Sequence, residues 1–257
     1  MIKIFETHAH YDDDAFDEDR ETLLQSFMEK GINKVVNIGA NLTTSRATVD
    51  LTKKYDFIYG TVGVHPSDIR ELEKAGAIEE IEALAKKDKI IAIGEIGLDY
   101  HYEDTDEGLQ KKWFINQMNL ARKLGLPIVV HSRDAAKDTM DIMIEEKAGD
   151  IGGVVHCFSY GWEVAQTFLD MGFYIGVGGV LTFKNGKKLK EVVERTPLER
   201  IVLETDAPYL APDPYRGKRN SSLYIPYVAE TIADIKGIST DEVYETTYNN
   251  ALKLYRL

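Results

Sequence analysis

The chain has 257 residues, of which 44% are hydrophobic and 29% are charged, and its formal net charge at pH 7 is −12. This composition is that of an ordinary globular protein with enough apolar residues for a sizeable core, and it excludes disordered and fibrous classes. The acidic balance argues against broad electrostatic binding to nucleic acid, because affinity for a polyanion comes largely from Lys and Arg side chains that neutralise phosphates.

Short apolar runs alternate along the chain with longer amphipathic segments. The predicted strands, in chain order, are Ile2–Phe5, Lys34–Ile38, Phe57–Val64, Ile90–Ile93, Ile128–Val130, Gly153–Val155, Phe173–Val177 and Arg200–Leu203. The predicted helices, which carry apolar residues at three- and four-residue spacing, are Arg20–Lys30, Thr44–Lys54, Ile78–Lys87, Gly108–Leu124, Ala135–Lys147, Gly161–Met171, Lys187–Arg195 and Leu223–Lys236. Eight strand–helix units imply parallel pairing and a closed barrel. We therefore predict an α/β fold, a (β/α)8 TIM barrel, with Thr240–Tyr255 as an extra C-terminal helix.

An open doubly wound sheet is the alternative architecture, since the same alternation can build it. The first strand of such a sheet would usually lead into a Gly-rich phosphate loop, and none follows Phe5. No repeat, low-complexity tract or long Gly/Ser linker interrupts the chain, so residues 1–257 are expected to form a single domain. The longest irregular stretch, Ala207–Ser222, is long enough to suggest a functional loop over the barrel mouth.

Two features bear on the cellular location of the chain. No apolar run approaches the ~20 residues that a membrane span needs, and the first strand leads into a polar turn instead of a secretory signal. Cys157 is the single cysteine, so an intrachain disulfide and a Cys-based metal site are both excluded. We expect a cytoplasmic protein with no membrane contact, and the sequence indicates no protein partner.

Residues that can bind metal stand at the ends of the predicted strands. They are His8 and His10 after the first strand, His65 after the third, Glu95 after the fourth, His131 after the fifth, His156 after the sixth and Asp206 after the eighth. In a barrel the C-terminal ends of the strands meet at one mouth, where active sites are found. Each residue alone has another explanation, such as a satisfied polar group or a helix cap. As a set at these positions, they favour a metal site.

The spacing and chemistry of these residues suit a pair of ions. His8 and His10 are two apart, so on an extended segment both imidazoles point to the same face. Imidazole and carboxylate ligands together suit several first-row metals, and Glu95 can bridge two ions with its two oxygens. Two ions roughly 3.5–4 Å apart can share a hydroxide nucleophile and clamp the attacked and leaving oxygens.

The motifs that carry these residues resemble the TatD family of metal-dependent deoxyribonucleases, within the amidohydrolase-like barrels. The matching runs are Thr7-His8-Ala9-His10, Gly63-Val64-His65-Pro66, Gly94 to Tyr100, Val130 to Ala135, His156-Cys157-Phe158-Ser159 and Glu204 to Leu210. Six ordered motifs over about four-fifths of the chain make the resemblance specific.

The resemblance implies two divalent cations per chain, Mg²⁺, Mn²⁺ or Zn²⁺. One would be held by His8, His10, Glu95 and Asp206, and the second by Glu95, His131 and His156. Asp206 would also orient or deprotonate the attacking water. His65 and Arg133 resemble ligands of a substrate phosphate, and an ion pair with Asp134 or with an acidic residue of a helix is the alternative role for Arg133.

Three positions depart from the family pattern. Glu6 stands where relatives carry Asp before the His-x-His motif, Tyr160 stands where they carry Gly, and Asn220-Ser221-Ser222 replaces Asn-Glu-Pro. A non-ligating group one methylene longer at position 6 should leave the metals in place. The other two departures lie near the expected mouth and bear on substrate detail.

The loop after the eighth strand carries a basic patch, formed by Arg216, Lys218 and Arg219 with Tyr209 and Tyr215 interleaved. Such a mixture can hold a nucleic-acid strand by phosphate contact and base stacking, and a solvated loop is the alternative. We predict Arg216 and Arg219 as substrate contacts. The lysines at positions 184, 187, 188 and 190 have instead the pattern of an exposed helix face.

Three functions remain open at this stage. The leading one is a phosphodiesterase acting on DNA as a 3′–5′ exonuclease, with Asp206 and Glu95 as catalytic groups; the polymer and the direction come only from the resemblance. A second is a metal-dependent ester or amide hydrolase, such as an aminoacyl-tRNA deacylase. The third is an inactive barrel that serves as a binding scaffold.

Overall fold

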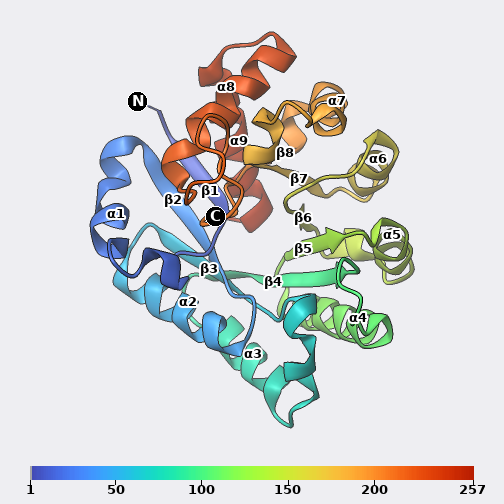
Figure 1. The fold of residues 1–257 in the computed structure, drawn as a ribbon. Coiled ribbons are helices and arrows are strands. Elements are labelled where there is room, and N and C mark those ends of the chain that lie inside the picture. The colour runs from blue at the N-terminus through green and yellow to red at the C-terminus, as the bar shows by residue number, and fades with distance from the viewer. Residues whose placement is uncertain (1) are drawn as a thin grey trace.

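The computed structural model describes residues 2–257, and its elements follow the predicted strand–helix alternation (Figure 1). The strands are β1 (Ile4–Ala9), β2 (Ile32–Ile38), β3 (Ile58–Val62), β4 (Ile90–Asp99), β5 (Ile128–Arg133), β6 (Gly153–Val155), β7 (Tyr174–Val177) and β8 (Ile201–Leu203). The helices are α1 (Arg20–Ser26), α2 (Leu42–Lys54), α3 (Ala77–Ala85), α4 (Glu107–Leu124), α5 (Ala136–Glu145), α6 (Trp162–Asp170), α7 (Lys187–Arg195), α8 (Ile225–Lys236) and α9 (Thr240–Tyr255). Short 3-10 turns are η1 (Asp14–Phe16), η2 (Met28–Lys30), η3 (Pro66–Glu73), η4 (Ala148–Asp150), η5 (Gly179–Thr182), η6 (Leu198–Arg200) and η7 (Ser222–Tyr224).

The eight strands form one parallel sheet in the order β1 to β8. The first and last strands meet through backbone hydrogen bonds, since the amide of Asp206 donates to the carbonyl of His8 at 2.9 Å and the amide of His10 donates to that of Ala207 at 2.8 Å. These bonds join the two edges of the sheet. The predicted (β/α)8 barrel is therefore confirmed, and the open-sheet alternative is not what forms.

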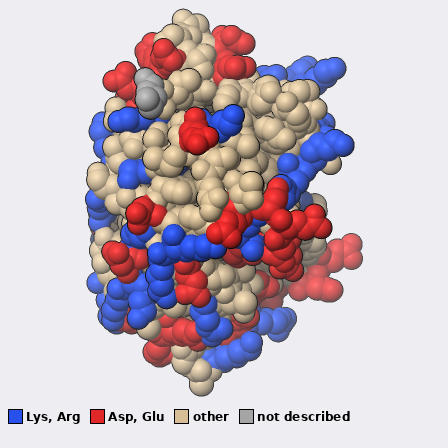
Figure 2. Space-filling model, turned by 90° about the vertical axis from the view of Figure 1, so that its left-hand side faces the viewer, with Lys and Arg blue, Asp and Glu red and all other residues tan. Residues whose placement is uncertain are grey.

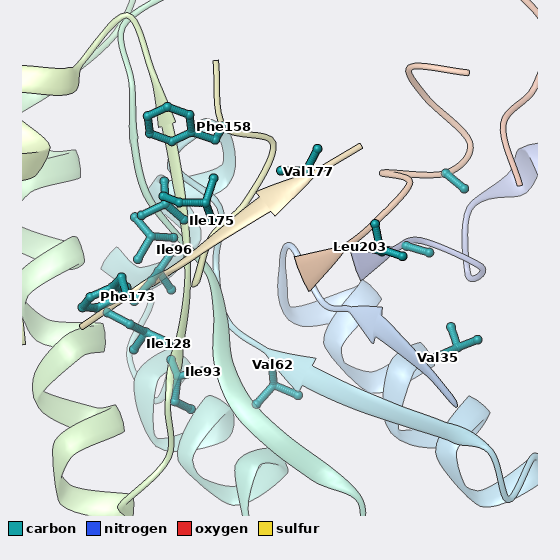
Figure 3. Close-up of a cluster of buried hydrophobic side chains, with 14 of the residues drawn as sticks. Val35, Val62, Ile93, Ile96, Ile128, Phe158, Phe173, Ile175, Val177 and Leu203 are labelled. Atoms are coloured by element: carbon teal, nitrogen blue, oxygen red, sulfur yellow. The ribbon is translucent and has the colours of Figure 1, made fainter. Parts of the chain in front are cut away.

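Two apolar clusters take alternate residues of the strands, as a parallel barrel buried on both faces requires. Val35, Ile128 and Leu203 belong to the larger cluster, which packs against the surrounding helices (Figure 3). Their neighbours Val36, Val129 and Val202 belong to the smaller cluster. Burial of such side chains contributes roughly 25 cal/mol per Å² of apolar area, which makes the strand–helix layers the main source of stability.

The last helix, α9, packs against the N-terminal ends of the strands. The side-chain amide of Asn250 donates to the carbonyl of Ile201, the first residue of β8, at 2.8 Å. The rings of Tyr248 and Tyr255 each lie 5.9 Å from the ring of Phe5 in β1, and Ala251 and Leu254 belong to the smaller cluster. The predicted extra helix therefore covers the end of the barrel opposite the predicted ligands.

Local signals in the sequence set the helix ends. Asn41 and Thr44 form a capping box at the start of α2, and the carboxylate of Asp106 accepts a hydrogen bond from the third residue of α4. Gly125 ends α4 in the left-handed conformation, which favours glycine. The caps at the starts of α2 and α4 lie in the loops around the barrel mouth, while Gly125 lies at the opposite end of the barrel, before β5.

No helix among residues 2–257 combines the length and the apolar character that a membrane crossing needs. Figure 2 shows the side of the molecule on which α1 and α2 lie, with acidic and basic side chains interspersed. The net charge of −12 is thus not offset by one continuous basic surface on this face.

Candidate functional site

The predicted ligands come together at the C-terminal ends of the strands, where all of them except the buried His8 line a cavity of about 980 Å³. Three predicted strands ended too early, because β1 extends to Ala9, β4 to Asp99 and β5 to Arg133, so His8, Glu95 and His131 lie inside strands. The pairing register shifts between Glu6 and Ala9 and between Ile93 and Ile96, around His8 and Glu95. Such irregular pairing is common next to active sites, because it redirects a side chain.

The first group of metal-binding atoms consists of His8, His10, Asp206 and Glu95. The Nε2 atoms of His8 and His10 lie 3.3 Å apart. An oxygen of Asp206 lies 3.6 Å and 3.5 Å from these two nitrogens, and Oε2 of Glu95 lies 3.5 Å and 3.9 Å from them. Donor atoms bound to one tetrahedral ion at about 2.0–2.2 Å stand roughly 3.3–3.6 Å apart. The spacing therefore suits one ion at the centre of the group.

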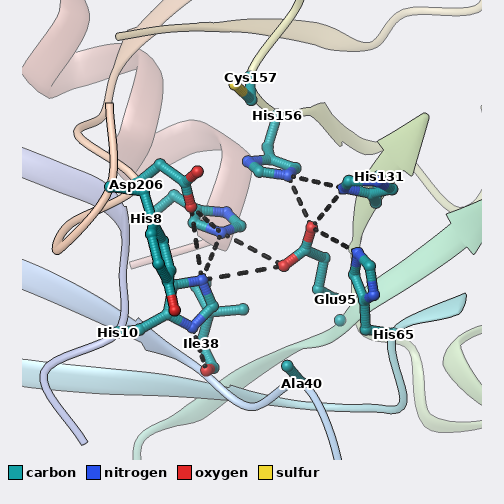
Figure 4. A network of polar contacts seen from close by, with 12 residues as sticks. His8, His10, Ile38, Ala40, His65, Glu95, His131, His156, Cys157 and Asp206 are labelled. Atoms are coloured by element: carbon teal, nitrogen blue, oxygen red, sulfur yellow. Dashed lines mark hydrogen bonds and ion pairs between the residues drawn. The ribbon is translucent and has the colours of Figure 1, made fainter. Parts of the chain in front are cut away.

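The second group lies on the other oxygen of Glu95 (Figure 4). Oε1 is 2.7 Å from Nε2 of His156 and 2.8 Å from Nδ1 of His131, and these two nitrogens are 3.4 Å apart. Glu95 thus stands between two groups and turns one oxygen to each. A carboxylate in this position can bridge two cations.

The tautomers of two histidines leave a lone pair directed into these groups. Nδ1 of His10 lies 3.1 Å from the carbonyl oxygen of Ile38, and Nε2 of His131 lies 3.1 Å from Oδ2 of Asp99. A neutral imidazole donates its one N–H to such an acceptor, so its other nitrogen carries the lone pair. In His131 that lone pair faces the carboxylate of Glu95, which requires a proton or a metal ion between them. The donor set therefore fits a cation.

Buried charges shift the ionisation of this site. Burial raises the pKa of Glu95, but the charges of His156 and His65 and the hydrogen bonds of His131 and His156 hold that pKa well below its usual value. Burial likewise opposes protonation of His131, yet Asp99 and Glu95 raise the pKa of its imidazole to about 9. The proton that His131 takes up between two carboxylates stands where a cation is expected.

Two acidic residues behind the site were missed by the sequence analysis. Asp99 is 3% exposed and orients His131. Glu204 is 1% exposed, accepts the amide of Cys157, and lies 3.9 Å from Nδ1 of His156. Asp99 could have been found, because it lies four residues after Glu95 on one strand and so points to the same face. Glu204 has no such signal, since its place depends on the packing of β7 and β8.

His65 and Arg133 have different surroundings at the cavity wall. The Nδ1 atom of His65 accepts the amide of Ser67 at 3.1 Å, so the neutral ring carries its proton on Nε2, 3.7 Å from Oε1 of Glu95. That nitrogen is a hydrogen-bond donor in this form. Arg133 lines the cavity beside the ring of Tyr102. The alternative ion pair of Arg133 is not formed, because Asp134 pairs with His101 at 3.0 Å.

The structure places Arg216 and Arg219 away from the cavity wall. The guanidinium of Arg219 donates to both carboxylate oxygens of Asp19, at 2.7 Å and 2.6 Å, and lies over the ring of Phe16. Arg216 lies over the ring of Phe183, 4.3 Å from its centroid. Of the same loop, Tyr209 and Leu210 line the cavity. Substrate contact by the two arginines stays a prediction, and both have other partners in the structure.

Comparison with known proteins places the whole chain in one family. A family model described as "TatD related DNase" matches residues 5–256. The chain is 40% identical over 254 residues to the uncharacterized metal-dependent hydrolase YabD of Bacillus subtilis, with 99% of each chain covered. It is 34% identical over 257 residues to the uncharacterized metal-dependent hydrolase YcfH of Escherichia coli, covering 99% of this chain and 96% of the relative.

Solved structures agree with this placement. The TatD homolog YJJV of Escherichia coli superposes with a TM-score of 0.92 at 28% identity, covering 99% of this chain and 98% of that one. A TatD family hydrolase of Entamoeba histolytica gives a TM-score of 0.90 at 28% identity, with 99% of each chain covered. The chain therefore belongs to the TatD family of metal-dependent hydrolases.

Proposed function

We propose that the chain is a two-metal-dependent deoxyribonuclease that hydrolyses phosphodiester bonds from the 3′ end of DNA. The observation that carries the proposal is the position of Glu95, whose two oxygens face two separate groups of metal donors on the floor of one cavity. DNA as the substrate follows the description of the family, and the direction follows the resemblance of the motifs.

In this proposal the two groups hold two divalent cations, Mg²⁺, Mn²⁺ or Zn²⁺. The first would be bound by His8, His10, Asp206 and Glu95, and the second by Glu95, His131 and His156. When bound, such ions act as Lewis acids that favour deprotonation of water and neutralise charge on the phosphodiester. Glu95 would contribute one carboxylate oxygen to each position.

The side chains around the two groups supply the remaining steps. Asp206 turns one oxygen to His8 and His10 on the open side of the site, where it can orient the attacking water and accept its proton. The Arg133 guanidinium has the fork geometry that matches two phosphodiester oxygens. The Nε2–H of His65 offers a further donor to the phosphate. Glu95 and His8 are buried, at 4% and 1% exposure, so the protein around them holds their side chains in place.

The experiment that tests the proposal is cleavage of end-labelled single- and double-stranded DNA 20-mers by chelator-stripped protein, with Mg²⁺ or Mn²⁺ added back. Stepwise shortening from the 3′ end is expected only with metal, and His131→Ala should abolish it. His101→Ala is the matched control, since this exposed histidine pairs with Asp134 outside both groups. Metal that binds tightly while DNA stays intact would contradict the proposal, and a parallel carboxylic-ester assay would then identify an ester hydrolase.

A further inference from the structure

Two basic segments that are distant in sequence lie side by side next to the cavity mouth. The first precedes and begins α7, and the second lies in the loop after β8. Their exposed basic residues without an ion pair, which we call the basic ridge, are Lys184, Lys187, Lys188, Arg216 and Lys218, while Arg219 is paired with Asp19. None of these five side chains makes an ion pair or a side-chain hydrogen bond with any other residue of 2–257. They are therefore free to bind an external anion.

Contacts between the two segments hold the ridge together. The Arg216 guanidinium lies 4.3 Å from the ring centroid of Phe183, the residue before Lys184. One residue earlier, the hydroxyl of Thr182 accepts the amide of Asp213 from the loop at 2.8 Å. The sequence analysis treated the lysines as an exposed helix face and the loop arginine separately. The structure joins them into one surface.

The ridge continues directly from the cavity wall. Val180 and Leu210 line the cavity, one from each of the two segments. A Cβ atom built on Gly186, just before α7, would lie 2.8 Å from the carbonyl oxygen of Val180, so the start of α7 sits against this wall. A Cβ on Gly179 would lie 2.1 Å from the carbonyl oxygen of Leu210. A chain leaving the cavity over Val180 and Leu210 therefore meets the lysines and Arg216.

The other lip of the cavity has the opposite charge. Asp12, Asp13 and Asp14 line it, and Tyr209 donates to Asp13 at 3.0 Å across the boundary between the two lips. A phosphate chain is repelled from the acidic lip and attracted to the basic one, because like charges disfavour and opposite charges favour approach.

We propose that the basic ridge binds the phosphates of the single-stranded DNA that extends from the cavity, and so sets the direction in which the substrate leaves the active site. This inference rests on the proposed nuclease function. Five side chains give a track for several nucleotides, while Arg133 at the cavity wall serves the phosphate being cleaved. We expect the ridge to lower KM for long substrates and to have no effect on KM for short ones.

The test compares a single-stranded 20-mer with a dinucleotide in the variant Lys184→Ser/Lys187→Ser/Lys188→Ser. At 50 mM salt we expect kcat/KM for the 20-mer to fall about tenfold, through a rise in KM, and kcat/KM for the dinucleotide to change by less than about twofold. The slope of log affinity for the 20-mer against log salt concentration should become shallower by roughly 0.7 per lost phosphate contact. The matched control is Lys30→Ser/Lys87→Ser/Lys253→Ser, which removes three exposed and unpaired lysines at the N-terminal end of the barrel.

Three results would contradict the proposed role of the ridge: an unchanged KM for the 20-mer, an equal loss of kcat/KM for the dinucleotide, or an equal loss of kcat/KM in the control variant. Fluorescence anisotropy of a labelled 20-mer separates this outcome from failure of the nuclease proposal. If the wild type hydrolyses neither substrate but binds the 20-mer more tightly than the ridge variant does, the nuclease function fails and the ridge stands. If the two bind equally, the ridge fails as well. Equal melting temperatures of the two variants exclude unfolding as the cause.

Discussion

The hydroxyl of Ser222 donates a 2.8 Å hydrogen bond to the buried carboxylate of Glu6, across 216 residues of sequence. The other oxygen of Glu6 accepts the amides of His8 and Thr205, so one carboxylate ties β1 to the segment that carries Asp206. Ser222 also contacts the hydroxyl of Tyr11 at 2.6 Å. The two positions that the sequence analysis set apart, 6 and 222, are thus partners of each other, and Glu6 links the strand of His8 to the segment that carries Asp206.

Ser222→Ala is expected to lower the free energy of unfolding by about 1–3 kcal/mol, because the buried oxygens of Glu6 and Tyr11 lose a partner that water cannot replace. Chemical denaturation of the two proteins measures the difference. Ser26→Ala serves as the control, since this half-buried hydroxyl contacts a single carbonyl, and a smaller effect is expected there. Equal losses of unfolding free energy at the two positions would show that the Glu6–Ser222 hydrogen bond stabilises the fold no more than an ordinary surface contact does.

Asp99→Asn should lower metal affinity or turnover by about 10- to 100-fold while leaving the fold intact, since Asp99 fixes the ring of His131 and raises the basicity of its Nδ1. Metal titration by calorimetry measures the affinity, and the melting temperature checks that the fold is intact. Asp134→Asn is the matched change at an exposed acid that pairs with a histidine outside the two groups. If Asp99→Asn binds metal as the wild type does, the orienting role is disproved.

Chelation is expected to abolish hydrolysis and to lower the melting temperature, because an ion that binds only the folded state stabilises it by mass action. Stripped wild-type protein should regain several degrees on addition of Mn²⁺ or Zn²⁺. Glu95→Gln should regain far less, since it removes a charge shared by both groups. Differential scanning fluorimetry across a metal series measures this, and equal recovery in both proteins would refute a shared ligand.

The ion pair between Arg219 and Asp19 is expected to make a small contribution to the free energy of unfolding that depends on pH. The hydrogen bond from Arg219 lowers the pKa of Asp19, so the folded state favours the ionised carboxylate. The contribution is therefore present at neutral pH and is lost as the pH falls through the lowered pKa, below 3.8. Arg219→Gln should lower stability at pH 7 by up to about 1 kcal/mol, since both groups are partly exposed.

Thermal unfolding at pH 7 and at pH 3 tests this pair, with the gap between the two proteins expected to shrink in acid. The same variant should keep the wild-type KM for DNA, because Arg219 is already occupied by Asp19. A rise in KM that disappears at high salt would instead indicate that Arg219 contacts the phosphates of the substrate.

Much of the barrel and of the metal-binding set was predictable because both depend on short-range patterns. Eight apolar runs fix the strands, and the His8–His10 spacing follows from strand geometry. The ends of β1, β4 and β5 were missed because polar residues interrupt the apolar pattern while the strand continues. The partners of Arg216 and Arg219 could not be predicted from the sequence. Phe183 lies 33 residues from Arg216 and Asp19 lies 200 residues from Arg219, so each contact forms only in the folded barrel.

The cavity lies at the C-terminal ends of the strands, and α9 packs Ala251, Leu254 and Tyr255 into the opposite end of the barrel. A DNA strand cannot thread through such a molecule as it would through a ring. In the proposed nuclease, the terminal nucleotide would therefore enter and the cleaved nucleotide would leave at the same end of the barrel, one before the other. Product release would then separate each cycle of hydrolysis from the next.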